Sequence, residues 1–270
     1  MRSDFHTHTR CSPDSSTAAD RVIEAAVKRG LTALAITDHA EIDPAGFGFV
    51  SPSCRTYSKY REIVSSAAAS FEGKIKTLMG VEVGYRTEFE EEIREFLGRH
   101  EFDIVIGSVH DSPPVDWWDP EARIVLAKRP ELGTQALIWY FTELERAASS
   151  GMFDVIAHID IYERYMPGLW PNVLEEPSIA PLAEKAVAAI AKHSRMEINM
   201  AMYNRKGEFA WSALPFLRMY KEMGGKEPTV GSDAHTPDWV GLNVEVGESL
   251  ARKAGFSKVA TWEDIMSSRT

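Results

Sequence analysis

Short apolar runs recur along the chain, and most are followed by a stretch whose apolar residues have helical spacing. Runs that are continuous rather than alternating are typical of parallel strands buried on both faces. The predicted strands are 4–5, Leu31–Ile36, Lys76–Val81, Asp103–Ser108, Phe153–Ala157, Met196–Asn199 and Pro228–Gly231. The predicted helices run from an N-cap at Ser16 or Thr17 to Gly30, and over Tyr57–Phe71, Phe89–Leu97, Thr134–Ser149, Pro181–His193 and Leu214–Met223.

About seven β–α units follow one another without a Pro/Gly/Ser-rich linker or a break in composition. We therefore expect an α/β protein in which residues 1–270 form a single domain, built as an irregular seven-stranded (β/α) barrel. An open doubly wound sheet is the alternative, but it would bring the ends of all strands to one point less easily. Two long segments, residues 40–56 and 111–120, interrupt the repeat after strand ends, so both should overhang that end of the barrel.

Metal-binding residue types follow six of the seven predicted strands. They are His6, His8, Asp38, His39, Glu82, His110, His158, Asp233 and His235. In a (β/α) barrel the C-terminal strand ends meet at one face, where reactive groups gather. Histidine and carboxylate side chains bind divalent cations, and clustered cations of this kind activate water. The pattern therefore predicts one metal centre to which almost every strand contributes.

The spacing within this set suggests roles for its members. His6 and His8 lie two apart on an extended segment, so both side chains can reach one cation. Asp233 and His235 repeat that spacing near the other end of the chain, and closure of the barrel would bring the two pairs together. Glu82 ends an apolar strand, where an unpaired carboxylate is costly to bury, so we expect it to bridge two cations.

Two aspartates have more than one reading. Asp38 can orient a neighbouring imidazole, transfer a proton or cap a helix. Asp14 lies in Ser12-Pro13-Asp14-Ser15-Ser16, which is also a good turn and helix-cap sequence. Spacing alone therefore favours a cap at Asp14 rather than a metal ligand.

Composition excludes several classes of protein. The 270 residues are 44% hydrophobic and 26% charged, as in an ordinary globular protein. No apolar run approaches the roughly 20 residues that span a bilayer, and we see no secretory signal. Two cysteines are too few for a disulfide framework, so we expect a cytoplasmic protein. A net charge of −10 argues against a stable nucleic-acid partner but not against a phosphate ester, because bound cations would reverse the local field.

At these residues the chain resembles the PHP family, named for its polymerase and histidinol phosphatase members. The matching stretches, which appear in family order, are His6-Thr7-His8, Thr37-Asp38-His39, Glu82, His110, His158 and Asp233-Ala234-His235. The resemblance implies a distorted seven-stranded β/α barrel that holds two or three divalent cations, commonly zinc, manganese or iron. The implied ligand sets are His6, His8, Glu82 and Asp233; Glu82, His110 and His158; and His39 and His235 with a residue at position 14.

Position 14 is where the chain departs from the family pattern. Many members have a histidine there, so Asp14 becomes an expected ligand. A carboxylate is harder than imidazole and favours manganese or iron at this site.

Within the family the chain is most similar to stand-alone histidinol-phosphate phosphatases, in its size and in the stretches Met196–Asn199 and Ser232–Pro237. This similarity implies an enzyme of histidine biosynthesis that hydrolyses a small phosphomonoester, L-histidinol phosphate. A hydroxide bridging two cations would attack phosphorus in line. The catalytic candidates are Asp38, Glu82 and Asp233, the phosphate-binding candidates are Arg164 and Arg205, and Glu41 or Asp43 could attract the substrate amine.

Three other functions stay open. A phosphodiesterase or nucleotidase could use the same centre, and the cations could instead be structural. A metal-dependent amidohydrolase also uses His-x-His on a barrel strand, but it would need a lysine at a strand end, and the sequence has none there.

Overall fold

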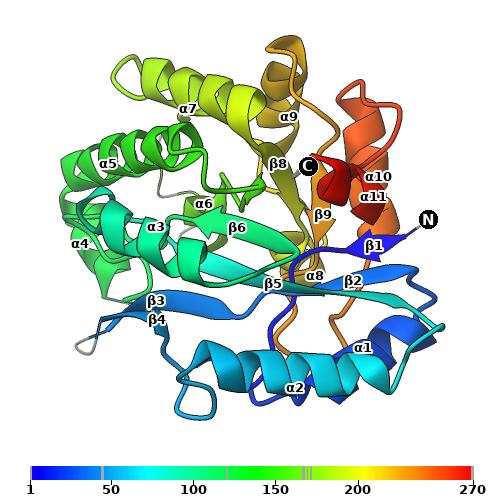
Figure 1. Cartoon of the computed structure of the whole chain (residues 1–270). Helices are drawn as coiled ribbons and strands as arrows, with labels where there is room; N and C mark the ends of the chain where they lie inside the picture. The colour runs from blue at the N-terminus through cyan, green and yellow to red at the C-terminus, as the bar shows by residue number, and fades with distance from the viewer. Residues whose placement is uncertain are drawn as a thin grey trace.

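Seven parallel strands form the wall of a barrel in the computed structural model, which describes residues 2–43, 46–119, 121–165, 168, 170 and 172–268. The strands are β1 (Ser3–Asp4), β2 (Ala33–Ile36), β5 (Lys76–Gly84), β6 (Ile104–Ser108), β7 (Val155–Ile156), β8 (Arg195–Asn199) and β9 (Thr229–Gly231), paired in that order. The first and last strands lie side by side (Figure 1), where the N–H of Phe5 donates to the carbonyl of Val230 at 3.1 Å. The sheet therefore closes almost completely, which confirms the predicted barrel over the open sheet.

Helices cover the outside of this wall. The longer ones are α1 (Ala19–Lys28), α2 (Tyr57–Ala69), α3 (Glu90–Arg99), α5 (Pro130–Ser149), α7 (Ala180–His193), α9 (Ala213–Glu222) and α10 (Val244–Lys253). The shorter ones are η1 (Thr87–Phe89), α4 (Ala122–Lys128), α6 (Ile161–Tyr165), α8 (Ala201–Lys206) and α11 (Trp262–Ser267). In Figure 1, α1 and α2 cover one flank and α5 and α7 cover another. Each predicted helix is present, with ends that differ by at most four residues.

Three local predictions need correction. The segment 40–56 contains a hairpin, β3 (His39–Asp43) and β4 (Gly46–Phe49), and β3 extends the barrel wall by pairing in parallel with β5. β5 runs three residues further than predicted, so Glu82 lies within the strand. Neither Ser16 nor Thr17 caps α1, whose N-cap residue is Ala18 without a side-chain hydrogen bond.

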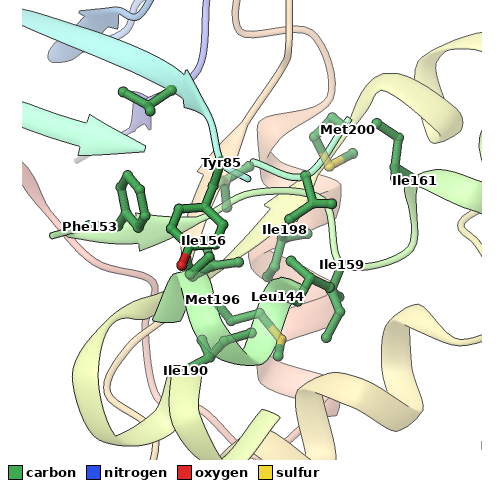
Figure 2. Close-up of a cluster of buried hydrophobic side chains, with 14 of the residues drawn as sticks. Tyr85, Leu144, Phe153, Ile156, Ile159, Ile161, Ile190, Met196, Ile198 and Met200 are labelled. Carbon is green, nitrogen blue, oxygen red and sulfur yellow. The ribbon is translucent and has the colours of Figure 1, made fainter. Parts of the chain in front are cut away.

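Two hydrophobic layers hold the barrel together. The outer layer packs the strands against the helices, and Figure 2 shows Ile156 of β7 and Ile198 of β8 gathered with Leu144 of α5 and Ile190 of α7. The inner layer fills the barrel interior with Phe5, Ala35, Leu78, Ile104, Ile106, Val155 and Ala157. Ile265 of α11 packs against this inner layer. The polar strand ends that carry the predicted ligands lie above this apolar filling.

Candidate metal centre

Glu82 stands at the centre of the predicted cluster. Alternation along β5 puts it on the same face as Leu78, so it rises into the barrel interior, and it is only 1% exposed. Its Oε2 lies 3.1 Å from Nε2 of His6, 3.5 Å from Nε2 of His8 and 3.1 Å from Nδ1 of His39. One carboxylate oxygen thus faces three imidazoles.

The other oxygen of Glu82 faces two more imidazoles. Oε1 lies 3.1 Å from Nε2 of His158 and 3.2 Å from Nε2 of His110. Strands β6 and β7 end just before these two histidines, so the parallel wall delivers them to the same height. The division of five imidazoles between two oxygens is the geometry expected of a carboxylate that joins two binding positions.

Asp233 closes the cluster from the last strand. Its Oδ1 lies 3.3 Å from Nε2 of His8 and 3.9 Å from Nε2 of His6, as closure of the barrel predicted. The backbone N–H of Asp233 donates to the carbonyl of His6 at 2.8 Å, which ties the two strand ends together. Asp233 has φ 53° and His158 has φ 24°, conformations that cost free energy in residues other than glycine and often occur at functional sites.

Asp14 faces the outer side of the cluster. Its Oδ2 lies 2.8 Å from Nε2 of His235 and 3.6 Å from Nε2 of His39. Asp14 does not cap α1, so the helix-cap reading of this residue is wrong. The neighbouring Ser15 hydroxyl donates to the carbonyl of His235 at 2.9 Å, which holds the turn against the end of β9.

Burial and charge leave Glu82 and His8 in the forms that bind cations, whereas the surrounding carboxylates raise the pKa of His6 and His110 against the effect of burial. Burial would raise the pKa of Glu82, but the imidazoles of His6, His39 and His110 hold it well below its usual range. Burial, together with the imidazoles of His235 and His39, lowers the pKa of His8 to about 3. The carboxylate is therefore ionised and the His8 ring neutral near pH 7, which cation binding requires.

Unpartnered buried atoms show that the cluster fits metal ions. Nε2 of His6, Nε2 of His8 and Oε2 of Glu82 are buried and have no hydrogen-bond partner, an arrangement that is costly without a ligand. Within the described part of the chain, the groups whose ligand atoms all lie within 4.8 Å of one another are His6, His8 and Asp233; Glu82, His110 and His158; His8, His39 and His235; and His39, Glu41 and His110. The donor set of imidazole and carboxylate suits zinc, manganese or iron.

Two outer partners that orient the histidines were not predicted. Nδ1 of His6 lies 2.7 Å from Oε1 of Glu197, and Nδ1 of His8 lies 3.0 Å from the Ser12 hydroxyl. Such contacts fix which ring nitrogen is free to bind a metal. Glu197 is 4% exposed in the apolar strand β8, so the burial argument applied to Glu82 could have found it. Ser12 lies in a turn and gives no comparable indication.

Asp38 forms hydrogen bonds with the segment that follows His8 and does not face the open side of the cluster. Its Oδ1 accepts hydrogen bonds from the Ser12 hydroxyl and the Thr9 N–H, both at 2.7 Å, and its Oδ2 accepts one from the Thr9 hydroxyl at 2.8 Å. Because Ser12 in turn contacts His8, these bonds favour the orienting role over proton transfer. Asp38 is not among the residues that line the cavity above the cluster, and its contacts match the orienting role that the sequence left open.

A cavity of about 230 Å³ opens above the cluster and is lined by most of the predicted ligands together with Trp118, Ile161, Arg164 and Arg205. Both predicted phosphate-binding arginines are therefore at the site. The Arg164 side chain is buried and paired with Asp233, its Nη1 donating to Oδ2 at 2.6 Å. Arg205 is exposed and lies over the ring of Trp239 at 5.4 Å.

The two interrupting segments reach the site in different ways. Trp118, from the second segment, lines the cavity and donates from Nε1 to the carbonyl of His110 at 2.8 Å. From the first segment, Glu41 contacts His110 instead of the cavity. The side chain of Asp43, the other predicted amine-binding candidate, lies outside the described part of the structure.

Comparison with known proteins finds relatives that match most of the chain. The family model described as the PHP domain matches residues 4–201. A histidinol-phosphatase of Lactococcus lactis is 28% identical over 265 residues, covering 97% of this chain and 94% of that protein. The crystal structure of a Lactococcus lactis histidinol phosphate phosphatase, complexed with zinc, L-histidinol and phosphate, aligns with a TM-score of 0.73 at 23% identity, covering 98% of this chain and 97% of that one. None of the helices that the structure describes combines the length and apolar character needed to cross a bilayer.

Proposed function

The chain belongs to the PHP domain family, and from this premise we propose that it is a metal-dependent phosphatase that hydrolyses L-histidinol phosphate to L-histidinol and phosphate. The observation that carries the proposal is the position of Glu82. Its two oxygens face five imidazoles at the floor of a cavity that two arginines also line. Clustered cations and arginine together are suited to a phosphate ester.

We assign the metal ligands to three sets. The first is His6, His8, Glu82 and Asp233, the second is Glu82, His110 and His158, and the third is Asp14, His39 and His235. When bound, the cations would lower the pKa of water and neutralise charge on the phosphoryl oxygens. Asp14 is the hardest donor of the third set, so manganese or iron is expected there more than at an all-histidine site.

Arg164 is proposed to hold the phosphate in one orientation. Its guanidinium is buried and fixed by Asp233, so it does not lose much freedom when a phosphate oxygen arrives. Arg205, which is exposed at the rim, would add a second and weaker contact. Together they would place the phosphorus over Glu82.

Asp233 is proposed to assist protonation of the leaving alkoxide. Arg164 and the nearby imidazoles hold the pKa of Asp233 well below its usual range against the effect of burial, so the carboxylate is ionised. Asp233 lines the cavity, and its Oδ1 lies near His8, where the ionised carboxylate can orient a water molecule that gives its own proton to the leaving alkoxide. Asp38 takes no part in this step, because Thr9 and Ser12 occupy its oxygens.

A substrate panel tests the proposal. Phosphate release would be measured with L-histidinol phosphate, a nucleoside monophosphate, p-nitrophenyl phosphate and the diester bis(p-nitrophenyl) phosphate, each with added manganese or zinc. We expect the highest kcat/KM for L-histidinol phosphate and almost no cleavage of the diester. A preference for the nucleotide or the diester would support the alternative activity, and no release from any ester would refute a phosphatase.

A further inference from the structure

Glu41 contacts the metal centre from the hairpin that interrupts the barrel repeat. Its Oε1 lies 2.8 Å from Nδ1 of His110, whose other nitrogen, Nε2, lies 3.2 Å from Oε1 of Glu82. The same Oε1 of Glu41 is 3.7 Å from Nδ1 of His39. His110 is thus held between two carboxylates, one on each ring nitrogen.

The pairing of β3 with β5 leaves space for the Glu41 carboxylate. β3 pairs in parallel with β5 so that His39 lies opposite Glu82, and the register carries Glu41 alongside Gly84. A Cβ on Gly84 would lie 1.8 Å from Oε2 of Glu41, so only glycine leaves room for this carboxylate. The hairpin is therefore built to bring one acidic side chain against His110.

The same arrangement occurs at the opposite side of the centre. Oε1 of Glu197 lies 2.7 Å from Nδ1 of His6, and a Cβ on Gly231 would lie 2.2 Å from that oxygen. In both places a strand glycine makes space for a carboxylate that holds the Nδ1 side of a histidine and leaves Nε2 facing Glu82. The recurrence indicates a positioning role for both carboxylates.

We propose that Glu41 is a positioning residue of the metal centre, which accepts the Nδ1–H of His110 and so fixes the tautomer whose Nε2 lone pair faces the site shared by Glu82 and His158. This inference rests on the proposed function, since it presupposes that His110 binds a cation. Carboxylates that hold metal-bound imidazoles in this way typically change metal affinity by about 10–100-fold when removed.

Two other roles for Glu41 are less consistent with its surroundings. A substrate-binding role would require the carboxylate to face the cavity, but Glu41 is not among the residues that line it. A direct ligand would need an oxygen free of His110 and Gly84, yet Oε1 contacts the imidazole and Oε2 rests against the glycine. The contacts therefore favour an action through His110.

Three variants of Glu41 and one control distinguish the effect of the position of its carboxylate from the effect of its charge. Glu41→Ala removes the carboxylate, Glu41→Asp keeps the charge but withdraws it from His110, and Glu41→Gln keeps an acceptor oxygen in place without the charge. Asp111→Asn is the matched control, because Asp111 is a nearby carboxylate, 51% exposed, that pairs with Arg86 instead of His110. Circular dichroism would verify the fold of each variant.

The measurement is the affinity of the metal-free proteins for Mn²⁺ and Zn²⁺, obtained by competition with a chelator, with KM and kcat for L-histidinol phosphate alongside. We expect Glu41→Ala and Glu41→Asp to bind one equivalent of cation about 10–100-fold more weakly, Glu41→Gln to stay within a few-fold of the wild type, and Asp111→Asn to be unchanged. If Glu41→Ala does not fold, Glu41→Asp carries the test.

Three results would overturn the inference: unchanged affinity in Glu41→Asp, equal weakening by Asp111→Asn, or a rise in KM alone with metal binding intact. The last of these would assign Glu41 to the substrate. Failure of the proposed function is recognised separately, because in that case the metal-loaded wild-type protein itself would not hydrolyse L-histidinol phosphate, whatever the metal affinities of the Glu41 variants.

Discussion

Replacing Gly231 with alanine should displace buried side chains of the metal centre, although the substitution itself removes no proposed metal ligand. Gly231 is the last residue of β9, and a Cβ there would lie 2.2 Å from Oε1 of Glu197 and 2.5 Å from Cβ of His6. Carbon atoms in ordinary contact keep at least about 3.4 Å, so these neighbours must move by roughly 1 Å. Both belong to the buried interior of the barrel, so the shift cannot be taken up by solvent-exposed side chains.

Two effects of different size follow from this displacement. Overpacking of a buried site costs about 1–3 kcal/mol of unfolding free energy. A 1 Å misplacement of a group that positions the reaction can lower turnover by about 10²-fold. We therefore expect Gly231→Ala to remain folded at 25 °C but to lose most of its phosphatase activity and part of its metal content.

The assay combines urea unfolding, metal analysis and phosphate release on the same preparation. Gly98→Ala is the matched control, because Gly98 lies in α3 and a Cβ there would have nothing within 4 Å. That control should gain up to about 1 kcal/mol from helix propensity and keep full activity. Wild-type turnover and metal content in Gly231→Ala would refute the view that Glu197 and His6 hold fixed positions.

Three further predictions concern single side chains. Glu82→Gln should lower phosphate release by at least about 10²-fold and reduce metal content, with an unchanged circular dichroism spectrum showing that the loss is not one of folding. Arg164→Ala should lower kcat/KM for L-histidinol phosphate by about 10–100-fold, since a hydrogen bond to a charged group contributes about 1.5–3 kcal/mol, and exposed Arg205→Ala should have a smaller effect; equal effects would argue against the assigned roles. Burial raises the pKa of Asp264, but hydrogen bonds from Lys258 and Thr261 outweigh it and lower this pKa from 3.8 to about 2. The ionised Asp264 therefore stabilises the fold fully at pH values above its pKa in the unfolded chain. This stabilisation is lost as the pH falls through its pKa in the folded protein. Asp264→Asn should therefore reduce the unfolding free energy by about 1 kcal/mol at pH 7 and by progressively less below pH 5, and a pH-independent difference in urea titrations would contradict this.

The sequence predicted the parts of the fold that depend on local periodicity. Continuous apolar runs such as Asp103–Ser108 identified the strands because parallel strands are buried on both faces. The convergence of His6 and Asp233 followed from closure of the barrel, and in the structure Nε2 of His6 lies 3.9 Å from Oδ1 of Asp233 and 3.1 Å from Oε2 of Glu82. The hairpin formed by β3 and β4 was missed because Pro44, Gly46 and Gly48 gave the segment the composition of a loop.

The outer partners were harder to predict, because their roles depend on tertiary contacts. Glu41 is adjacent to His110 only after β3 pairs with β5, and nothing in the local sequence encodes that register. The prediction of proton transfer by Asp38 did not take the Thr9 and Ser12 hydroxyls into account. Both are too distant from Asp38 in the sequence to be recognised as its hydrogen-bond partners. The sequence at the predicted strand ends thus identifies the metal-binding residue types. It does not identify the residues that orient those side chains.

The most direct test is the rate of phosphate release from L-histidinol phosphate by chelator-treated protein, before and after Mn²⁺ or Zn²⁺ is returned. We predict almost no activity in the metal-free protein and recovery that follows the bound cation up to a stoichiometry of two or three. Full activity without metal, or a metal-loaded protein that leaves this ester intact, would contradict the proposed function.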